Sequence, residues 1–232
     1  ALGFELLSTG GTARTLKEAG LPVTLVSDVT QHPEIFDGRV KSLHPAIHGP
    51  LLARLHQKAD DEELQRLGYA PIRVVACNLY PFGDAAATVP PLSDDALLEM
   101  IDIGGPTMVR ASAKNHRHVL IATNPARYGD VIEALQSVDE PALVGMDLRQ
   151  SLALEAFEHT AAYDVAIAQE LHRRVVGDPT QGVSMEEQRD RLPRSVLEAS
   201  HLVDSLRYGE NGHQAAALYV DHDAPHGHNT LV

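Results

Sequence analysis

The segment FDGRVKSLHPAIHG, residues 36–49, places two cationic side chains on either side of one valine. Arg39 and Lys41 are two residues apart, so in an extended segment they project to the same side of the backbone. Ser42 follows with a hydroxyl that can donate a hydrogen bond. This group is suited to hold a small anion. The alternative interpretation is a solvated edge strand that carries two charges.

A Gly-rich turn, Thr9-Gly10-Gly11-Thr12, precedes an expected helix. Such a turn offers backbone N–H groups, two hydroxyls and the positive end of a helix dipole, and a phosphate fits that environment. The pattern is neither GxGxxG nor a P-loop, because no Gly-Lys-Ser/Thr follows. Alone the turn indicates a structural corner. Together with the cationic segment 39–42 it predicts a phosphate cradle.

Three ionisable side chains could transfer protons. Asp102 precedes the Gly-Gly turn of IDIGGPTMVRASAKNH, and Lys114 follows about three helical turns later. A carboxylate and an ammonium in one pocket shift each other's pKa and can divide a proton transfer. Tyr80 and Asn78 follow an apolar strand, at the end where open α/β sheets bind ligands. Each residue also has a purely structural alternative. Asp102 would be an acid in a loop, and Lys114 would neutralise a helix C-terminus. Tyr80 would be a core aromatic, and Asn78 would cap the strand.

Composition limits the class of protein. The 232 residues include 19 Lys and Arg against 32 Asp and Glu, a net charge of −13, which argues against a nucleic-acid or anionic-membrane partner. Cys77 is the single cysteine and lies in an apolar run, so we expect a buried hydrophobe, no intrachain disulfide and a cytoplasmic location. The histidines lack metal-binding spacing, and no stretch has the apolar length of a membrane span.

The elements that would position these residues alternate along the chain. Strands are predicted at the start of the chain and over 21–29, 72–79 and 118–123. Helices are predicted after the Gly-rich turn to Gly20, from Pro45, over 60–69, from about Ser93 to Gly104, from Pro106, from Asn124 as N-cap, and over 147–175. This alternation predicts an α/β layered domain with a mainly parallel sheet.

The pattern changes after the last long helix. We expect a first domain over 1–175, a polar linker over 176–200, and the incomplete beginning of a second domain over 201–232. LRYGENGHQAAALYV predicts a loop followed by a strand, which we expect to be disordered or held against the first domain or a partner subunit. The His-containing stretch 222–229 indicates a solvated tail.

Six blocks occur in the order and spacing of one family. They are STGGT, GRVKSLHPAIHG, RVVACNLYPF, IDIGGPTMVRASAKNH, AFEHTAAYD and LRYGENGHQAAALY. The chain therefore resembles the bifunctional purine biosynthesis family, in which IMP cyclohydrolase is joined to AICAR transformylase. The resemblance implies a methylglyoxal-synthase-like fold without the family's first strand and helix. Ser42 stands where threonine is usual, and Gly212 where the family has proline.

The resemblance implies that the first domain closes the purine ring of FAICAR to give IMP and water. The matching phosphate positions are Thr9, Gly10, Gly11, Thr12, Arg39, Lys41 and Ser42. The matching catalytic positions are Lys41, Tyr80, Asp102 and Lys114, and the base-recognition positions are Asn78, Asp102, Ile103 and Gly104. In the incomplete second domain, Arg207 and Tyr208 would contact AICAR.

The resemblance also sets expectations for partners. The ligand is a nucleotide, FAICAR or IMP, and the assembly a homodimer, with no nucleic acid and no membrane. The cyclohydrolase needs no cofactor or metal. 10-Formyltetrahydrofolate serves only the full-length transformylase, whose Lys-His pair lies beyond Val232, so we expect no formyl transfer by this chain.

Two other activities remain open. A nucleotide-sensing regulatory domain, as in carbamoyl phosphate synthetase, has the same fold but would not need Tyr80, Asp102 and Lys114 together. Methylglyoxal synthase would have no use for the long helix and LRYGENGHQ.

Overall fold

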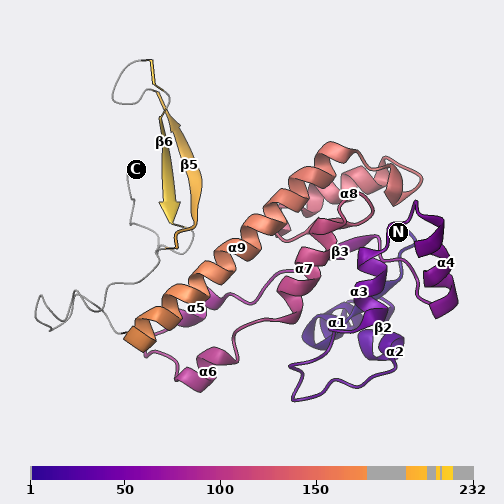
Figure 1. Cartoon of the computed structure of the whole chain (residues 1–232), viewed down its shortest axis with the longest axis horizontal. Coiled ribbons are helices and arrows are strands. Elements are labelled where there is room, and N and C mark those ends of the chain that lie inside the picture. The colour runs from indigo at the N-terminus through magenta and orange to yellow at the C-terminus, as the bar shows by residue number, and fades with distance from the viewer. Residues whose placement is uncertain (1, 177–196, 208–212, 215, 222–232) are drawn as a thin grey trace, which may run out of the picture. The chain divides into compact units, whose positions relative to one another are not determined.

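The computed structural model describes residues 2–176, 197–207, 213–214 and 216–221 (Figure 1). The chain divides into two compact units. The first unit contains residues 1–80 and 102–160, and the second contains 81–101 and 161–232. All the predicted nucleotide-site residues lie in the first unit.

The first unit begins with two parallel strands that flank a helix. They are β1 (Leu6–Ser8), α1 (Gly10–Glu18) and β2 (Val23–Leu25), with Leu6 paired to Val23. The strand predicted over 21–29 is wrong in its second half, because α2 (Val26–Thr30) follows β2 directly. Val26 and Thr30 are both buried and lie four residues apart, so one face of a helical turn buries them together. Burial outweighs the strand preference of these β-branched residues.

The residues just before Lys41 form a tight turn, so Arg39 and Lys41 do not lie in the extended segment considered for them. Ile35 and Val40 form an antiparallel bridge around this turn, and Phe36, Asp37 and Gly38 all have positive φ. The helix α3 (Pro45–Leu52) follows, with Pro45 at its first position as predicted. The Nδ1 atom of His44 caps it by accepting a 3.1 Å hydrogen bond from the N–H of Ala46.

A second parallel pair forms the centre of the unit. The strands β3 (Val74–Ala76) and β4 (Leu120–Ala122) pair with Val74 opposite Leu120, as the predicted α/β pattern requires. The helix α7 (Gly104–Lys114) lies between them in sequence and packs against α3 (Figure 1). The remaining elements are α4 (Lys58–Leu67), η1 (Pro125–Arg127), α8 (Tyr128–Gln136), η2 (Pro141–Leu143) and α9 (Met146–Val176).

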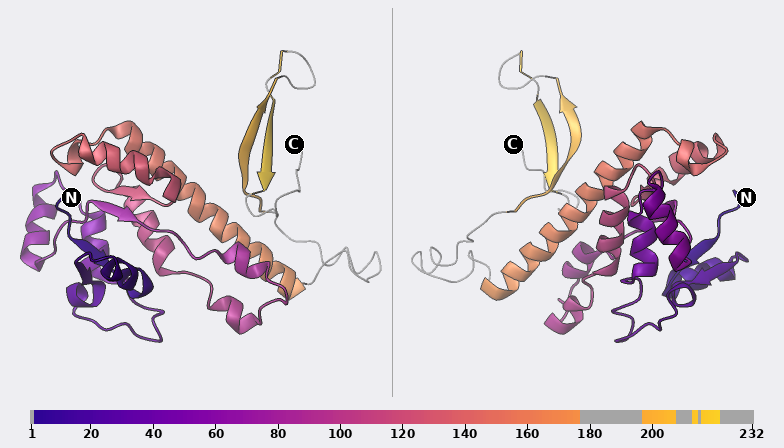
Figure 2. Two further views of the ribbon diagram at one scale, coloured as in Figure 1. Left: turned by 180° about the vertical axis from the view of Figure 1, so that it is seen from behind. Right: turned by 45° about the vertical axis from the view of Figure 1, so that its right-hand side comes forward.

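One core cluster joins β4 to α8 and the first part of α9, the long helix seen in Figure 2. Its buried members are Leu120, Ala122, Val131, Leu135, Val144 and Leu152. The predicted N-cap Asn124 is confirmed, since its side-chain oxygen accepts a 2.9 Å hydrogen bond from the N–H of Ala126. The predicted helix over 147–175 is confirmed as α9.

The start of α7 differs from the prediction, because Gly104 and not Pro106 is its first residue. The carboxylate of Asp102 accepts a hydrogen bond from the N–H of Gly105, which satisfies a first-turn donor. Pro106 then lies within the first turn, where its missing N–H costs no helical hydrogen bond.

The second unit contains α5 (Phe82–Ala86), α6 (Asp94–Leu98), the later part of α9, and a hairpin of β5 (Ser200–Leu206) and β6 (Ala216–Asp221). Ser93 caps α6, but that helix ends at Leu98 and does not extend to Gly104 as predicted. The strand after the Gly-rich loop is confirmed as β6. Sequence analysis missed β5, whose residues are all exposed.

Most of the predicted linker and the whole stretch 222–229 lie outside the described residues. Within the described part of the chain, no helix is both long enough and apolar enough to span a membrane.

Candidate functional site

The ammonium group of Lys41 lies at the start of α1. Gly10 has a φ of +50°, and its Cβ position would be 3.6 Å from Lys41 Nζ. Thr9 precedes the helix in an extended conformation and makes no side-chain capping hydrogen bond. A cation at a helix N-terminus opposes the helix dipole, so an anion placed between them is stabilised by both. The predicted combination of the Gly-rich turn with Lys41 is therefore present in space.

Ser42 continues this surface to the first residue of α7. Its Oγ atom lies 3.0 Å from the position that a Cβ on Gly104 would occupy. The neighbouring Ile103 is 59% exposed. The turn that carries Lys41 thus connects the N-terminal ends of α1 and α7, two helices that are far apart in sequence.

Asp102 is held at the first turn of α7. Its Oδ1 atom accepts a 2.9 Å hydrogen bond from the N–H of Gly105, and a Cβ on Gly105 would lie 2.3 Å from Oδ2. The same Cβ position is 2.9 Å from the side chain of Leu79, which follows β3. Gly105 therefore allows the carboxylate to approach α7 and the end of β3 together.

The pKa of the Cys77 thiol is affected by burial and by the charge of Asp102. Burial, and then the charge of Asp102, raise the pKa of the Cys77 thiol to about 11. A thiol with that pKa stays protonated at neutral pH and is a weak nucleophile. Cys77 itself is half-buried rather than the fully buried residue that was expected, and the effect of Asp102 on its pKa places the Asp102 carboxylate near the end of β3.

Asn78 joins the C-terminal ends of the two parallel strands. Its amide nitrogen donates a 2.8 Å hydrogen bond to the carbonyl of Thr123, and its amide oxygen accepts a 2.7 Å bond from the hydroxyl of Tyr128. The predicted capping role at the strand end is therefore present. An amide carries two N–H donors, so one is left over for a ligand. Tyr80, two residues later, is 58% exposed and presents its phenol to solvent.

Lys114 lies at the opposite end of α7 from Asp102. It is the last residue of the helix, ten residues after Gly104, which corresponds to about 15 Å along the axis. That separation exceeds the length of a lysine side chain. The two groups therefore form no direct ion pair within one chain, and joint action on a proton requires a molecule between them.

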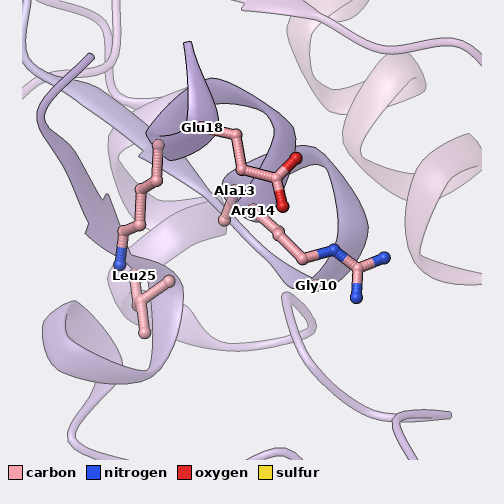
Figure 3. A pocket seen from close by; sticks show the side chains of 6 residues that line it. Gly10, Ala13, Arg14, Glu18 and Leu25 are labelled. Atoms are coloured by element: carbon pink, nitrogen blue, oxygen red, sulfur yellow. The ribbon is translucent and has the colours of Figure 1, made fainter. Parts of the chain in front are cut away.

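The structure places two further cations, Arg14 and Lys17, along α1, and the sequence analysis did not single them out. A hollow of about 420 Å³ runs along α1 and is lined by Gly10, Ala13, Arg14, Lys17, Glu18 and Leu25 (Figure 3). Arg14 lies four residues after Gly10, and this spacing places it on the same helix face. The four-residue spacing between Gly10 and Arg14 was the feature of the sequence that could have identified Arg14 as a site residue.

Arg39, Arg207 and Tyr208 are the next predicted residues to be placed. Arg39 is exposed in the turn before Lys41, and Arg207 is exposed at the end of β5. Tyr208 lies outside the described residues. Among the residues that the structure describes, no three His, Cys, Asp or Glu side chains are grouped closely enough to hold a metal ion.

Comparison with known families covers nearly the whole chain. The model of the MGS-like domain matches residues 1–107, and that of the AICARFT/IMPCHase bienzyme matches residues 112–231. The chain belongs to the AICARFT/IMPCHase bienzyme family. The predicted fold class, a methylglyoxal-synthase-like α/β domain, is confirmed by the first of these matches together with the parallel strand pairs.

Individual members of the family are similar over most of the chain. The "Bifunctional purine biosynthesis protein PurH" of Synechococcus sp. (strain CC9311) is 51% identical over 217 residues, which is 94% of this chain and 40% of the relative. The protein of the same name from Myxococcus xanthus (strain DK1622) is 47% identical over 224 residues, 97% of this chain and 40% of the relative. The chain thus spans about 40% of the length of these relatives.

A solved structure supports the fold independently. The protein described as "Crystal structure of ForH" superposes with a TM-score of 0.64 at 35% sequence identity. The match covers 73% of this chain and 87% of that one.

Proposed function

We propose that this chain binds FAICAR and closes its purine ring to give IMP, as the cyclohydrolase part of a bifunctional purine biosynthesis enzyme. One observation carries the proposal: the Lys41 ammonium lies at the start of α1 on a surface that continues through Ser42 to Gly104. This surface runs from the N-terminus of α1, which suits an anion, to the carboxylate of Asp102. A nucleotide would place its phosphate at the first end and its base at the second. The names of the curated relatives, which describe a bifunctional purine biosynthesis protein, agree with this assignment.

The phosphate of the nucleotide would lie at the N-terminus of α1. The N–H groups of the first turn supply hydrogen bonds, and Lys41 supplies the compensating charge. Arg39 lies within the same turn as Lys41 and adds a second cation. The N-terminus of α7, beginning at Ile103 and Gly104, would then face the base.

Ring closure joins a carboxamide nitrogen to a formyl carbon. The carboxamide nitrogen loses one proton as the new C–N bond forms. The formamide nitrogen loses a second proton as the C=N double bond forms and the C–O bond breaks, and the formyl oxygen takes up both protons and departs as water. A carboxamide nitrogen is a poor nucleophile, so a nearby base accelerates attack, and Asp102 at the start of α7 is placed to accept the carboxamide proton. Tyr80 can donate to the developing alkoxide, and Lys41 or Lys114 can stabilise its charge. Because the reaction is intramolecular, positioning contributes much of the rate.

The wider family assignment adds proposals that depend on the longer protein. We propose a cytoplasmic homodimer that takes small nucleotides and no nucleic acid or membrane. Arg207 and Tyr208 would contact AICAR, and 10-formyltetrahydrofolate would be the formyl donor of the transformylase domain. The cyclohydrolase step itself uses no cofactor in this account, because every proton it moves can be carried by a side chain of the site.

The test measures turnover and binding separately. Asp102→Asn should lower the rate of IMP formation from FAICAR by roughly 10²–10⁴ while IMP affinity changes less than about tenfold, because proton transfer is lost and shape is kept. Lys58→Ala, on α4, is the control, because the exposed Lys58 forms its ion pair with Glu62 on the same helix. Parental turnover in Asp102→Asn would contradict the assignment of this carboxylate as the base.

A further inference from the structure

A group of basic side chains lies at the other end of the central parallel pair. Arg73 directly precedes β3, and Arg117 and His118 precede β4. The carbonyl of Arg73 accepts a 2.9 Å hydrogen bond from the N–H of Leu120, so the two strands begin side by side. Parallel strands start at the same edge, which places these residues at the edge opposite Asn78 and Tyr80. We call this group, with His56 and Arg149, the basic edge.

Arg149 contributes a buried positive charge to the basic edge. It is 2% exposed, and its guanidinium donates to the carbonyls of Val144 at 3.0 Å, His116 at 3.1 Å and Pro141. These three carbonyls satisfy its hydrogen bonds but carry no net charge. A buried charge without an ionic partner is costly, and an anion nearby would offset that cost.

Five other arginines of the described residues form ion pairs with carboxylates. Ion pairs join Arg54 to Asp60, Arg66 to Glu63, Arg127 to Glu155, Arg173 to Glu170 and Arg174 to Asp94. Within the described ranges, neither Arg73 nor Arg117 has such a carboxylate partner. Both are therefore available, as rigid bidentate donors, to an oxyanion from outside the chain.

Two histidines extend the group toward α3. The Nδ1 atom of His56 lies 3.0 Å from the Nε2 atom of His118, and the rings stack with centroids 4.9 Å apart. Burial, then His56 and the charges of Arg73, Arg149 and Arg117, lower the pKa of His118. Burial and then Arg73 also lower the pKa of Arg149. The charged neighbours that act on these two groups are thus cations.

We propose that the basic edge is a second anion site, separate from the surface at α1, which binds a small multivalent phosphate-type anion through Arg73 and Arg117. Arg149 contributes the buried charge, and the exposed His56 and partly buried His118 border the ligand. The proposal does not depend on the nucleotide chemistry proposed above, because the two sites lie at opposite edges of the β3–β4 pair.

The test uses the full chain in the Lys41→Ala background, which removes the anion-binding lysine of the other site. Titration calorimetry with pyrophosphate, and separately with inorganic phosphate, measures affinity at low ionic strength. Arg73→Gln and Arg117→Gln together should weaken pyrophosphate binding at least tenfold. Arg66→Gln on α4 is the matched control and should change it less than twofold. Far-ultraviolet circular dichroism verifies that each variant is folded.

A second measurement localises the anion. In an NMR titration of the imidazoles, pyrophosphate should move the pKa of His118 upward, because a bound anion stabilises its imidazolium against Arg73, Arg117, Arg149 and His56. The upward shift should disappear in Arg73→Gln/Arg117→Gln. The proposal is overturned by no pyrophosphate binding in the Lys41→Ala background, by equal weakening in Arg66→Gln, or by an unmoved His118.

Discussion

The tight packing around Gly105 in the candidate site predicts what a methyl group added at this residue would do. Gly105→Ala would place a Cβ 2.3 Å from the Oδ2 atom of Asp102 and 2.9 Å from the side chain of Leu79. Neither neighbour can yield freely, because the Asp102 carboxylate is bonded to the N–H of Gly105 and Leu79 is 9% exposed. The carboxylate must therefore leave its position at the start of α7.

The expected loss in stability combines three contributions. Losing a hydrogen bond to a charged acceptor costs about 1.5–3 kcal/mol. Overpacking against Leu79 costs about 1–3 kcal/mol. Alanine regains about 0.5–1 kcal/mol over glycine in a helix. The free energy of unfolding should fall by about 3.5 kcal/mol, the centre of that balance.

Gly129→Ala provides a matched control. Gly129 is also the second residue of its helix, α8, but a Cβ there meets nothing within 4 Å. Urea unfolding followed by circular dichroism should show Gly129→Ala slightly more stable than the parent and Gly105→Ala clearly less stable. Adding Asp102→Ala should reduce the cost of Gly105→Ala, because the clashing carboxylate is gone. Equal stability of the two glycine variants would refute this reasoning.

Two further predictions follow from shifted pKa values. With a pKa of about 11, the Cys77 thiol should react with maleimide at pH 8 about 100-fold more slowly than in the unfolded chain. Asp102→Asn should accelerate the reaction by removing a charge that opposes the thiolate, and parental speed in that variant would contradict the assigned proximity. Hydrogen bonds from Arg54 lower the pKa of Asp60 to about 2, so its stabilising effect should be present above about pH 4 and disappear as pH falls toward 2. In Arg54→Ala, a carbon-detected NMR titration should find that pKa raised from about 2 but not to its ordinary value, because the backbone N–H of residue 54 still donates to Asp60; a value still near 2 would exclude the Arg54 side chain as the main cause.

The sequence predicted much of the fold because the signals were local. Pro45, Asn124 and Ser93 mark helix starts through their own backbone and side-chain chemistry, and each lies where it was expected. The errors occurred where distant contacts decide. Val26 and Thr30 carry strand propensity but are buried as a helical turn, and every residue of β5 is exposed.

The candidate site was predictable by residue type but not by arrangement. Asp102 and Lys114 share one short segment, and only the length of α7 shows that about 15 Å of helix separates them. Nothing in the spacing of residues 39–42 indicated a tight turn, or that Lys41 would reach Gly10. The basic edge could not be predicted from the sequence, because its residues come from four separate segments and come together only when β3 and β4 pair.

The most direct test of the central claim compares the affinities of IMP and inosine by titration calorimetry. A desolvated charge-assisted contact contributes about 1.5–3 kcal/mol, so the phosphate should improve affinity at least tenfold. Lys41→Ala should remove most of that preference, while Lys58→Ala should leave it intact. An equal affinity for IMP and inosine in the parent, or an undiminished preference in Lys41→Ala, would contradict the placement of a nucleotide phosphate at α1.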